Sequence, residues 1–160
     1  MTQPAIDARN ADQVAYWNGP GGKHWTDRQQ LQDIVLSPVS KVLIDRAAVK
    51  AGDAVLDIGC GCGATSFDLL HKVGPTGRVT GIDISEPMLG RARELAPKDA
   101  PVEFVLADAT VHPFAPASTD MLFSRFGVMF FAQPSDSFAN MRKALRPGGP
   151  LVFACWRTPR

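Results

Sequence analysis

The sequence predicts an α/β protein built on a parallel sheet, and three features of the chain carry that prediction. Short apolar runs alternate with helix-compatible stretches from residue 51 onward. Segments rich in glycine and proline separate these stretches. Repeated strand–helix–strand units imply parallel strands joined by right-handed crossovers. Alternating glycines follow the first apolar run and let the backbone turn sharply and approach a ligand.

Helix is predicted for the region that precedes this alternation. A strong turn cluster lies at residues 18–22. Apolar positions at helical spacing then predict helix from Asp27 to Val49. Pro38 is expected to divide this helix, with Ser37 or Ser40 available as a cap.

The chain is expected to form one structural domain, with a helical cap at residues 1–48 and a core at residues 49–160. Within the cap, residues 1–12 are expected to be a loose tail. The expected core strands are Ala54–Ile58, Arg78–Ile82, Val102–Leu106, Met121–Phe126 and Leu151–Cys155. The expected core helices are Ala64–Val73, Glu86–Ala96 and Asp136–Leu145. The connection 110–120 contains three prolines and is expected to hold at most one turn of helix.

Composition excludes several classes of protein. A length of 160 residues with 45% apolar and 21% charged residues is ordinary for a globular domain. The net charge is +1 and no basic block is present, so nucleic acid is not an expected partner. No apolar run approaches the ~18 residues of a membrane span, and the N-terminus lacks a signal-peptide core. Three cysteines do not make a disulfide framework, which favours reduced thiols and a cytoplasmic location.

The glycine loop, by itself, is compatible with more than one nucleotide-like cofactor. Gly59-x-Gly61-x-x-Ala64 satisfies the relaxed dinucleotide fingerprint, and Asp83 lies about 20 residues further on, at the end of the second strand. A carboxylate at that position can accept hydrogen bonds from both hydroxyls of a ribose. The alternative is that Asp83 caps the helix that begins near Glu86.

Three further features separate the cofactors. Asp57 precedes the first glycine by two residues, Ala107-Asp108-Ala109 closes the third strand, and Arg146-Pro147-Gly148-Gly149 introduces the last one. With them the sequence resembles the class I S-adenosylmethionine-dependent methyltransferases, and among these the small-molecule group of the ubiquinone/menaquinone-biosynthesis type. The matching segments cover residues 54–156 and are VLDIGCGCGATS, GIDISEPML, ADA, SRFGVMFF and ALRPGGPLVFACW. The segment WNGPGGKHW, nearer the N-terminus, is also similar to that group.

The resemblance implies a Rossmann-like sheet in the order 3-2-1-4-5 with S-adenosyl-L-methionine bound at its carboxyl edge. The loop at residues 59–63 would approach the methionine moiety, and Asp57 would help to orient its ammonium directly or through water. Asp83 would bind the ribose diol. The full cofactor-binding set implied is Asp57, Gly59, Cys60, Gly61, Gly63, Asp83, Ile84, Met88, Asp108, Ala109, Ser124 and Arg125.

The same resemblance implies which residues contact the adenine ring and where the acceptor lies. Asp108 would accept from the adenine amino group, while the backbone N–H of Ala109 would meet a ring nitrogen. Met88 would pack on the adenine or ribose face. Ser124 and Arg125 would lie where the methyl group and the acceptor meet.

No catalytic residue is named from the sequence. An activated methyl group needs mainly positioning, and a general base only if the acceptor arrives protonated. We expect His71 to be a surface residue and His112 to structure a loop, and nothing assigns a role to His24. Cys60-x-Cys62 lacks a second pair of ligands that would complete a zinc site, so no metal is expected and small-residue packing explains the two thiols better.

The acceptor side is the least determined part of the chain. Trp17 and Trp25 could close over the cofactor or an apolar acceptor, or pack the cap against the sheet. The apolar run at residues 126–131 could line an acceptor pocket or belong to the core. The sequence leaves both pairs of alternatives open.

The chain also departs from the resemblance at its end. The family's sheet continues beyond the fifth strand into an antiparallel hairpin, whereas this chain stops at Arg160. We expect Val152 and Phe153 to be partly uncovered on an edge strand. The expectation is therefore a truncated form, or a chain that covers this edge by forming a homodimer.

Three hypotheses follow for the function. The first is an S-adenosylmethionine-dependent methyltransferase acting on a small, apolar or aromatic acceptor by in-line transfer. The second is a non-catalytic remnant that binds the cofactor or serves only as an interaction module. The third is an NAD(P)-dependent oxidoreductase, which Asp57 and the Asp108 motif disfavour. A Tyr–Lys pair is also lacking, since the only tyrosine is Tyr16.

Overall fold

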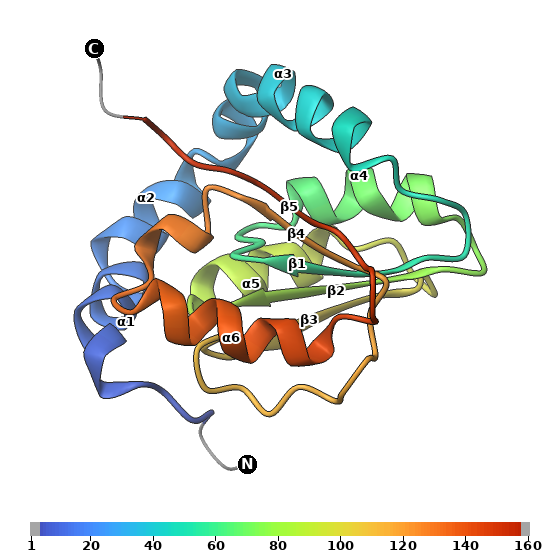
Figure 1. Ribbon diagram of the computed structural model, residues 1–160. Helices are drawn as coiled ribbons and strands as arrows, with labels where there is room; N and C mark the ends of the chain where they lie inside the picture. Colours follow the sequence, from blue (N-terminus) through green and yellow to red (C-terminus); the bar gives the residue numbers. More distant parts are fainter. Residues whose placement is uncertain (1–3, 158–160) are drawn as a thin grey trace.

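Five parallel strands form one sheet in the order β3-β2-β1-β4-β5 in the computed structural model, which describes residues 4–157 (Figure 1). The strands are β1 Ala54–Ile58, β2 Arg78–Asp83, β3 Val102–Leu106, β4 Met121–Arg125 and β5 Leu151–Ala154. The helices are η1 Ala8–Asn10, α1 Ala11–Asn18, α2 Pro20–Asp27, α3 Gln29–Ala47, α4 Ala64–Val73, α5 Glu86–Leu95, η2 Val128–Phe130 and α6 Pro134–Ala144. The α/β class and the strand order predicted from the sequence are confirmed.

Helices pack on both faces of the sheet, and successive residues of the central strands point to opposite sides. Val55 of β1 packs in one cluster with residues of α3 and α4, and Phe123 of β4 belongs to the same cluster. Leu56 and Ile58 of β1 pack instead against Met141 of α6. Figure 1 accordingly shows α6 in front of the sheet and α5 behind it. This arrangement leaves the carboxyl ends of the strands free to build a site.

The N-terminal region differs from its prediction. The expectation of a loose tail is wrong for the part of it that the structure describes, since η1 and α1 occupy residues 8–18. The turn cluster is also shorter than expected. Only Gly19 separates α1 from α2, and Pro20 starts α2, where its missing N–H costs no hydrogen bond. Gly21 lies inside this helix, at a position without room for a side chain, since a Cβ there would collide with the ring of Tyr16.

The expected break at Pro38 is also wrong, since α3 continues through it. A proline at this position removes the N–H that would otherwise bond the carbonyl of Ile34. The hydroxyl of Ser37 donates to that same carbonyl at 3.0 Å and so satisfies it. Ser40 does not cap a helix either, since its hydroxyl donates to the carbonyl of Leu36 at 3.2 Å.

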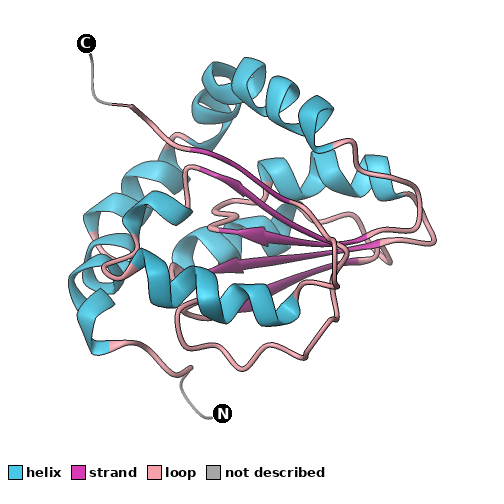
Figure 2. Cartoon of the chain, viewed as in Figure 1, coloured by secondary structure: helices cyan, strands magenta, loops and turns pink. Residues whose placement is uncertain are grey.

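The connection after β3 and the last two strands complete the core. The connection 110–120 forms no helix and is drawn as loop throughout in Figure 2. Strand β5 lies at one edge of the sheet, where Leu151 and Phe153 are 38% and 45% exposed. Strand β4 ends one residue earlier than predicted because Phe126 adopts a left-handed φ of 68°.

Among the described residues, no helix is both long and apolar enough to cross a membrane.

Candidate functional site

A cavity of about 270 Å³ opens at the carboxyl edge of the sheet, where the ends of β1 to β4 meet helices α1 to α3. Most of the residues implied by the resemblance line it. These are Gly59, Cys60, Gly61, Asp83, Ile84, Met88, Asp108, Ala109 and Arg125. The other three, Asp57, Gly63 and Ser124, are buried and are not among the lining residues.

The glycine loop shapes the floor of the cavity. The backbone φ values of Gly59 and Gly61 are 69° and 56°, which residues other than glycine rarely adopt. The chain after β4 also approaches this loop closely. A Cβ built on Gly59 would lie 2.5 Å from the Cα of Gly127. Gly59 and Gly127 therefore allow the loops that follow β1 and β4 to lie side by side.

Asp57 is a fully buried carboxylate whose hydrogen bonding is incomplete. Its Oδ2 accepts from the hydroxyls of Thr65 and Ser66, both at 2.7 Å. Its Oδ1 has no partner among the described residues. Burial raises the pKa of Asp57 to about 6, against the lowering effect of the two hydroxyls and of the Arg125 charge. A buried acceptor oxygen without a donor is costly, so this position suits a ligand that brings a donor.

Asp83 lies at the end of β2 and connects the glycine loop to the next turn. Its Oδ2 accepts from the N–H of Gly61 at 2.8 Å, and its Oδ1 from the N–H of Ser85 at 2.9 Å. Helix α5 is instead capped by the side chain of Ser85, which accepts from the N–H of Met88. The alternative that Asp83 caps this helix is therefore wrong. Burial raises the pKa of the Asp83 carboxyl.

The carboxylate of Asp108, expected to accept from adenine, already accepts three hydrogen bonds from the protein. The N–H of Asp7 and the side-chain amide of Asn10 donate to its Oδ2 at 3.0 and 2.8 Å. The N–H of Thr110 donates to its Oδ1 at 2.9 Å. A carboxylate offers about four acceptor positions, so one remains, on Oδ1. The neighbouring N–H of Ala109 has no acceptor among the described residues.

Ser124 and Arg125 have different surroundings: Ser124 is bonded within the scaffold, and Arg125 lines the cavity. The hydroxyl of Ser124 donates to the carbonyl of Ile58 at 2.7 Å and accepts from the N–H groups of Gly127 and Val128 at 3.2 and 3.3 Å. It therefore fastens the loop after β4 to β1 and does not face the cavity. Arg125 does line the cavity, and its Nη1 donates to Ser40 at 2.6 Å. Burial lowers the pKa of this guanidinium.

Met88 and the two loop cysteines give the cavity apolar walls. A Cβ on Gly61 would lie 2.7 Å from the terminal methyl of Met88, so this side chain packs directly against the loop. Cys60 and Cys62 are buried, and burial raises the pKa of both thiols, that of Cys62 to about 12. Both thiols stay protonated near neutral pH and pack as small apolar groups.

The helical cap contributes residues that sequence reasoning missed as site residues. Asn10, Gln13, Gln32, Asp33 and Leu36 line the cavity, as do Trp17 and Trp25. The segment WNGPGGKHW was the only signal that pointed to this region. Its two tryptophan rings meet edge to face, with centroids 6.3 Å apart.

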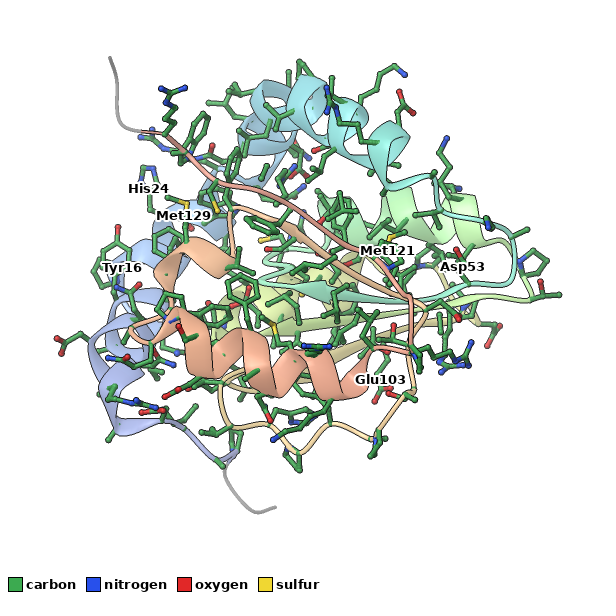
Figure 3. All side chains as sticks on the ribbon, viewed as in Figure 1. Tyr16, His24, Asp53, Glu103, Met121 and Met129 are labelled. Carbon is green, nitrogen blue, oxygen red and sulfur yellow. The ribbon has the colours of Figure 1, made fainter. Side chains whose placement is uncertain are left out.

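None of the three histidines, all within the described residues 4–157, lines the cavity. His24 is exposed on α2 (Figure 3), and His71 is exposed on α4, as expected for a surface residue. His112 lies in the loop after β3, where its ring meets Phe114 edge to face. Among the described residues, Arg125 is the one cationic group that lines the cavity, together with the acids Asp33, Asp83 and Asp108.

Fold and site together define a Rossmann-like α/β protein with a cavity at the carboxyl edge of its sheet, where ligands bind in open α/β sheets of this kind. The chain belongs to the methyltransferase domain family, since residues 55–149, more than half of its length, match the model of that family.

Curated relatives of known name agree with this assignment. The chain is 40% identical over 119 residues to the ubiquinone/menaquinone biosynthesis C-methyltransferase of Pseudomonas fluorescens, covering 72% of this chain and 46% of the relative. It is 33% identical over 119 residues to the aklanonic acid methyltransferase of a Streptomyces species, covering 73% of this chain and 54% of the relative. The chain thus spans about half or less of the length of these relatives.

Solved structures give the same fold. Phosphoethanolamine N-methyltransferase 2 of Haemonchus contortus, in complex with S-adenosyl-L-methionine, aligns with a TM-score of 0.68 at 30% identity over 72% of this chain and 27% of that one. A methyltransferase from Aquifex aeolicus, described as dependent on the same cofactor, aligns with a TM-score of 0.68 at 25% identity, over 76% and 66% of the two chains.

Proposed function

We propose that this chain binds S-adenosyl-L-methionine in the cavity and transfers its methyl group to a small-molecule acceptor. The charge around the glycine loop carries the proposal. Asp57 lies just before the glycine loop, and Asp83 accepts from the N–H of Gly61 within it. Asp33 lines the same cavity. Their negative charge attracts a cofactor that carries an ammonium and a sulfonium, and it repels the diphosphate of a dinucleotide. An oxidoreductase that uses NAD(P) is disfavoured for that reason.

Each carboxylate is proposed to meet one part of the cofactor. The unpartnered Oδ1 of Asp57 accepts from the ammonium directly or through a water, and Asp83 accepts from the ribose hydroxyls. The free position on Asp108 accepts from the adenine amino group, and the N–H of Ala109 donates to a ring nitrogen. Met88 packs against the nucleoside.

The residues around the cavity are proposed to act by positioning. When bound, the cofactor would supply an activated methyl group on a sulfonium, suited to in-line transfer to an acceptor. The chain's own residues exclude water and orient the acceptor. Aromatic side chains line the same cavity as the glycine loop and favour an apolar or aromatic acceptor. They are Trp17, Trp25, Phe126, Phe130, Phe131 and Trp156.

Calorimetry tests the cofactor assignment. The chain is expected to bind S-adenosylhomocysteine with measurable heat and to show none with NAD. Binding of NAD alone would contradict the proposal. A panel of quinones, aromatic acids and amines, assayed with a cofactor labelled in its methyl group, then separates the enzyme from the alternative of a non-catalytic remnant. Tight binding without turnover of any acceptor would favour the remnant.

The raised pKa of Asp57 predicts a pH dependence of cofactor binding. An ionised Asp57 favours the ammonium, so the affinity for S-adenosylhomocysteine is expected to fall as pH drops through about 6. Between pH 7 and pH 5 the loss should be about tenfold. The Asp57→Asn variant should bind weakly at both pH values, with the pH dependence gone. Equal affinities of the unaltered chain at the two pH values would remove Asp57 from the cofactor site.

The stability of the free protein should change in the opposite direction with pH. The folded Asp57 keeps its proton up to about pH 6, whereas the unfolded value is 3.8. The unfolded chain therefore binds fewer protons between these values, and this group's contribution to the free energy of unfolding decreases as pH rises from about 4 to 6. Binding and stability measured across the same pH range thus respond with opposite signs.

Two finer properties remain proposals. A cytoplasmic location is supported by Cys60, Cys62 and Cys155, which are all free thiols. Self-association is supported by the exposed side chains of Leu151 and Phe153 on the edge strand β5. Sedimentation at rising protein concentration would check it, and a monomer throughout would exclude it.

A further inference from the structure

The segment Asp7–Asn10 packs against Asp108 through Asp7 and Asn10, of which Asn10 lines the cavity, although it lies about a hundred residues away in the sequence. Asn10 is only 4% exposed, and Asp108 is 1% exposed. The amide of Asn10 donates to Asp108 Oδ2 at 2.8 Å and to the hydroxyl of Thr110 at 3.0 Å. Its carbonyl oxygen accepts from the N–H of Ala132 at 3.1 Å. Every polar group of this side chain is therefore engaged.

These contacts decide how the carboxylate of Asp108 is presented. Asn10 and the N–H of Asp7 fill both acceptor positions of Oδ2, and Thr110 fills one position of Oδ1. The carboxylate has no cationic partner within salt-bridge distance among the described residues. Its orientation therefore depends on neutral donors, of which the Asn10 amide and the N–H of Asp7 come from outside the core, and Asn10 is the one that acts through its side chain.

We infer that Asn10 is a positioning residue for base recognition, which acts through Asp108 and directs the last free acceptor position of that carboxylate toward an exocyclic amine of a purine. The inference rests on the proposed function, because it requires that an adenosyl group occupies this end of the cavity. The neighbouring N–H of Ala109 completes a donor–acceptor pair that matches the edge of adenine.

A salt bridge fastens the segment from its outer side. Nη1 of Arg9 lies 2.8 Å from Asp136 near the start of α6, while the rest of the guanidinium bonds to Asp7. This contact lies on the surface and does not touch Asp108. It holds the segment in place, whereas Asn10 sets the direction of the carboxylate.

The test compares two ligands that differ in one group. One is S-adenosylhomocysteine, and the other is its analogue with purine in place of adenine, which lacks only the exocyclic amine. The unaltered chain should prefer the adenine ligand by about tenfold or more, the value of one hydrogen bond to a charged group. Asn10→Ala should reduce this preference to about twofold or less, chiefly by weakening the binding of the adenine ligand.

A matched control separates orientation from a general loosening of the cap. Asn18 also holds the cap to the core, since its side chain bonds the carbonyl of Ile84 and the N–H of Glu86, but it does not touch Asp108. Asn18→Ala should keep the preference for the adenine ligand. In an Asp108→Asn background, Asn10→Ala should have no further effect on the preference, because the two residues act as one unit.

The outcomes are distinguishable. If the unaltered chain binds neither ligand, the proposed function fails. If it binds both, and Asn10→Ala keeps the full preference or weakens both ligands equally, the positioning role is overturned while the proposed function stands. Thermal unfolding checks that each variant is folded. Asn10→Ser, whose hydroxyl is too short to hold Asp108, provides a milder second variant for the same comparison.

Discussion

Replacing Gly127 by alanine is expected to lower the free energy of unfolding by about 3 kcal/mol and to weaken cofactor binding. The backbone of Gly127 is right-handed, with φ −74°, so alanine brings no conformational strain there. Its Cβ, however, would lie 2.5 Å from the carbonyl oxygen of Ile58 and 2.7 Å from the Cα of Gly59. Since both neighbours are backbone atoms, β1 and β4 must separate at the glycine loop. Urea denaturation measures the loss.

Gly90 provides the matched control. It lies inside α5, and a Cβ there would meet no atom within 4 Å. Gly90→Ala is therefore expected to raise the free energy of unfolding by about 0.5–1 kcal/mol, because alanine favours helix. A Gly127→Ala variant as stable as the unaltered chain would show that the two loops do not need this close approach.

Replacing Asp83 by alanine is expected to weaken the binding of S-adenosylhomocysteine by at least about tenfold. The variant removes the acceptor proposed for the ribose, and it also leaves the N–H groups of Gly61 and Ser85 without their partner. Calorimetry with the ligand and with its 2′-deoxy analogue isolates the first effect. The unaltered chain should discriminate between the two ligands, and Asp83→Ala should not.

Asp53→Ala serves as the control for that experiment. Asp53 precedes β1 at the opposite end of the sheet and accepts from the N–H of Lys50 at 2.8 Å (Figure 3). This variant also removes a carboxylate that bonds a backbone N–H, but far from the cavity, so the affinity should not change. An Asp83→Ala variant with undiminished affinity would refute the ribose assignment.

Much of the core could be predicted because its signals are local. Strand β1 and helix α4 have the predicted bounds, since an apolar run, a glycine turn and a helical apolar pattern all lie within twenty residues. The resemblance implied site residues on other strands as well, and this part of the site assignment stays a prediction. Asp83 and Ala109 do line the cavity, because the carboxyl ends of neighbouring parallel strands meet at one edge.

The cap could not be predicted in the same way because its partners are distant in sequence. Pro38 is tolerated inside α3 because Ser37 supplies the missing hydrogen bond and the helix packs on the sheet through Leu43 and Ile44. The segment at residues 7–10 is ordered by hydrogen bonds to Asp108, which cross 101 and 98 residues. No local pattern encodes such contacts.

By itself, the sequence determined the α/β class through periodicity and turn residues. The motifs that carry the family resemblance determined the family, and the resemblance in turn implied the strand order. Only the tertiary structure decided which side chains face the cavity. It kept Ser124 out of the cavity lining, left one oxygen of Asp57 without a partner and brought Asn10 to Asp108. The physical reason is that burial and hydrogen bonding are settled by the whole packed chain, since each buried polar group must find a partner wherever the fold supplies one.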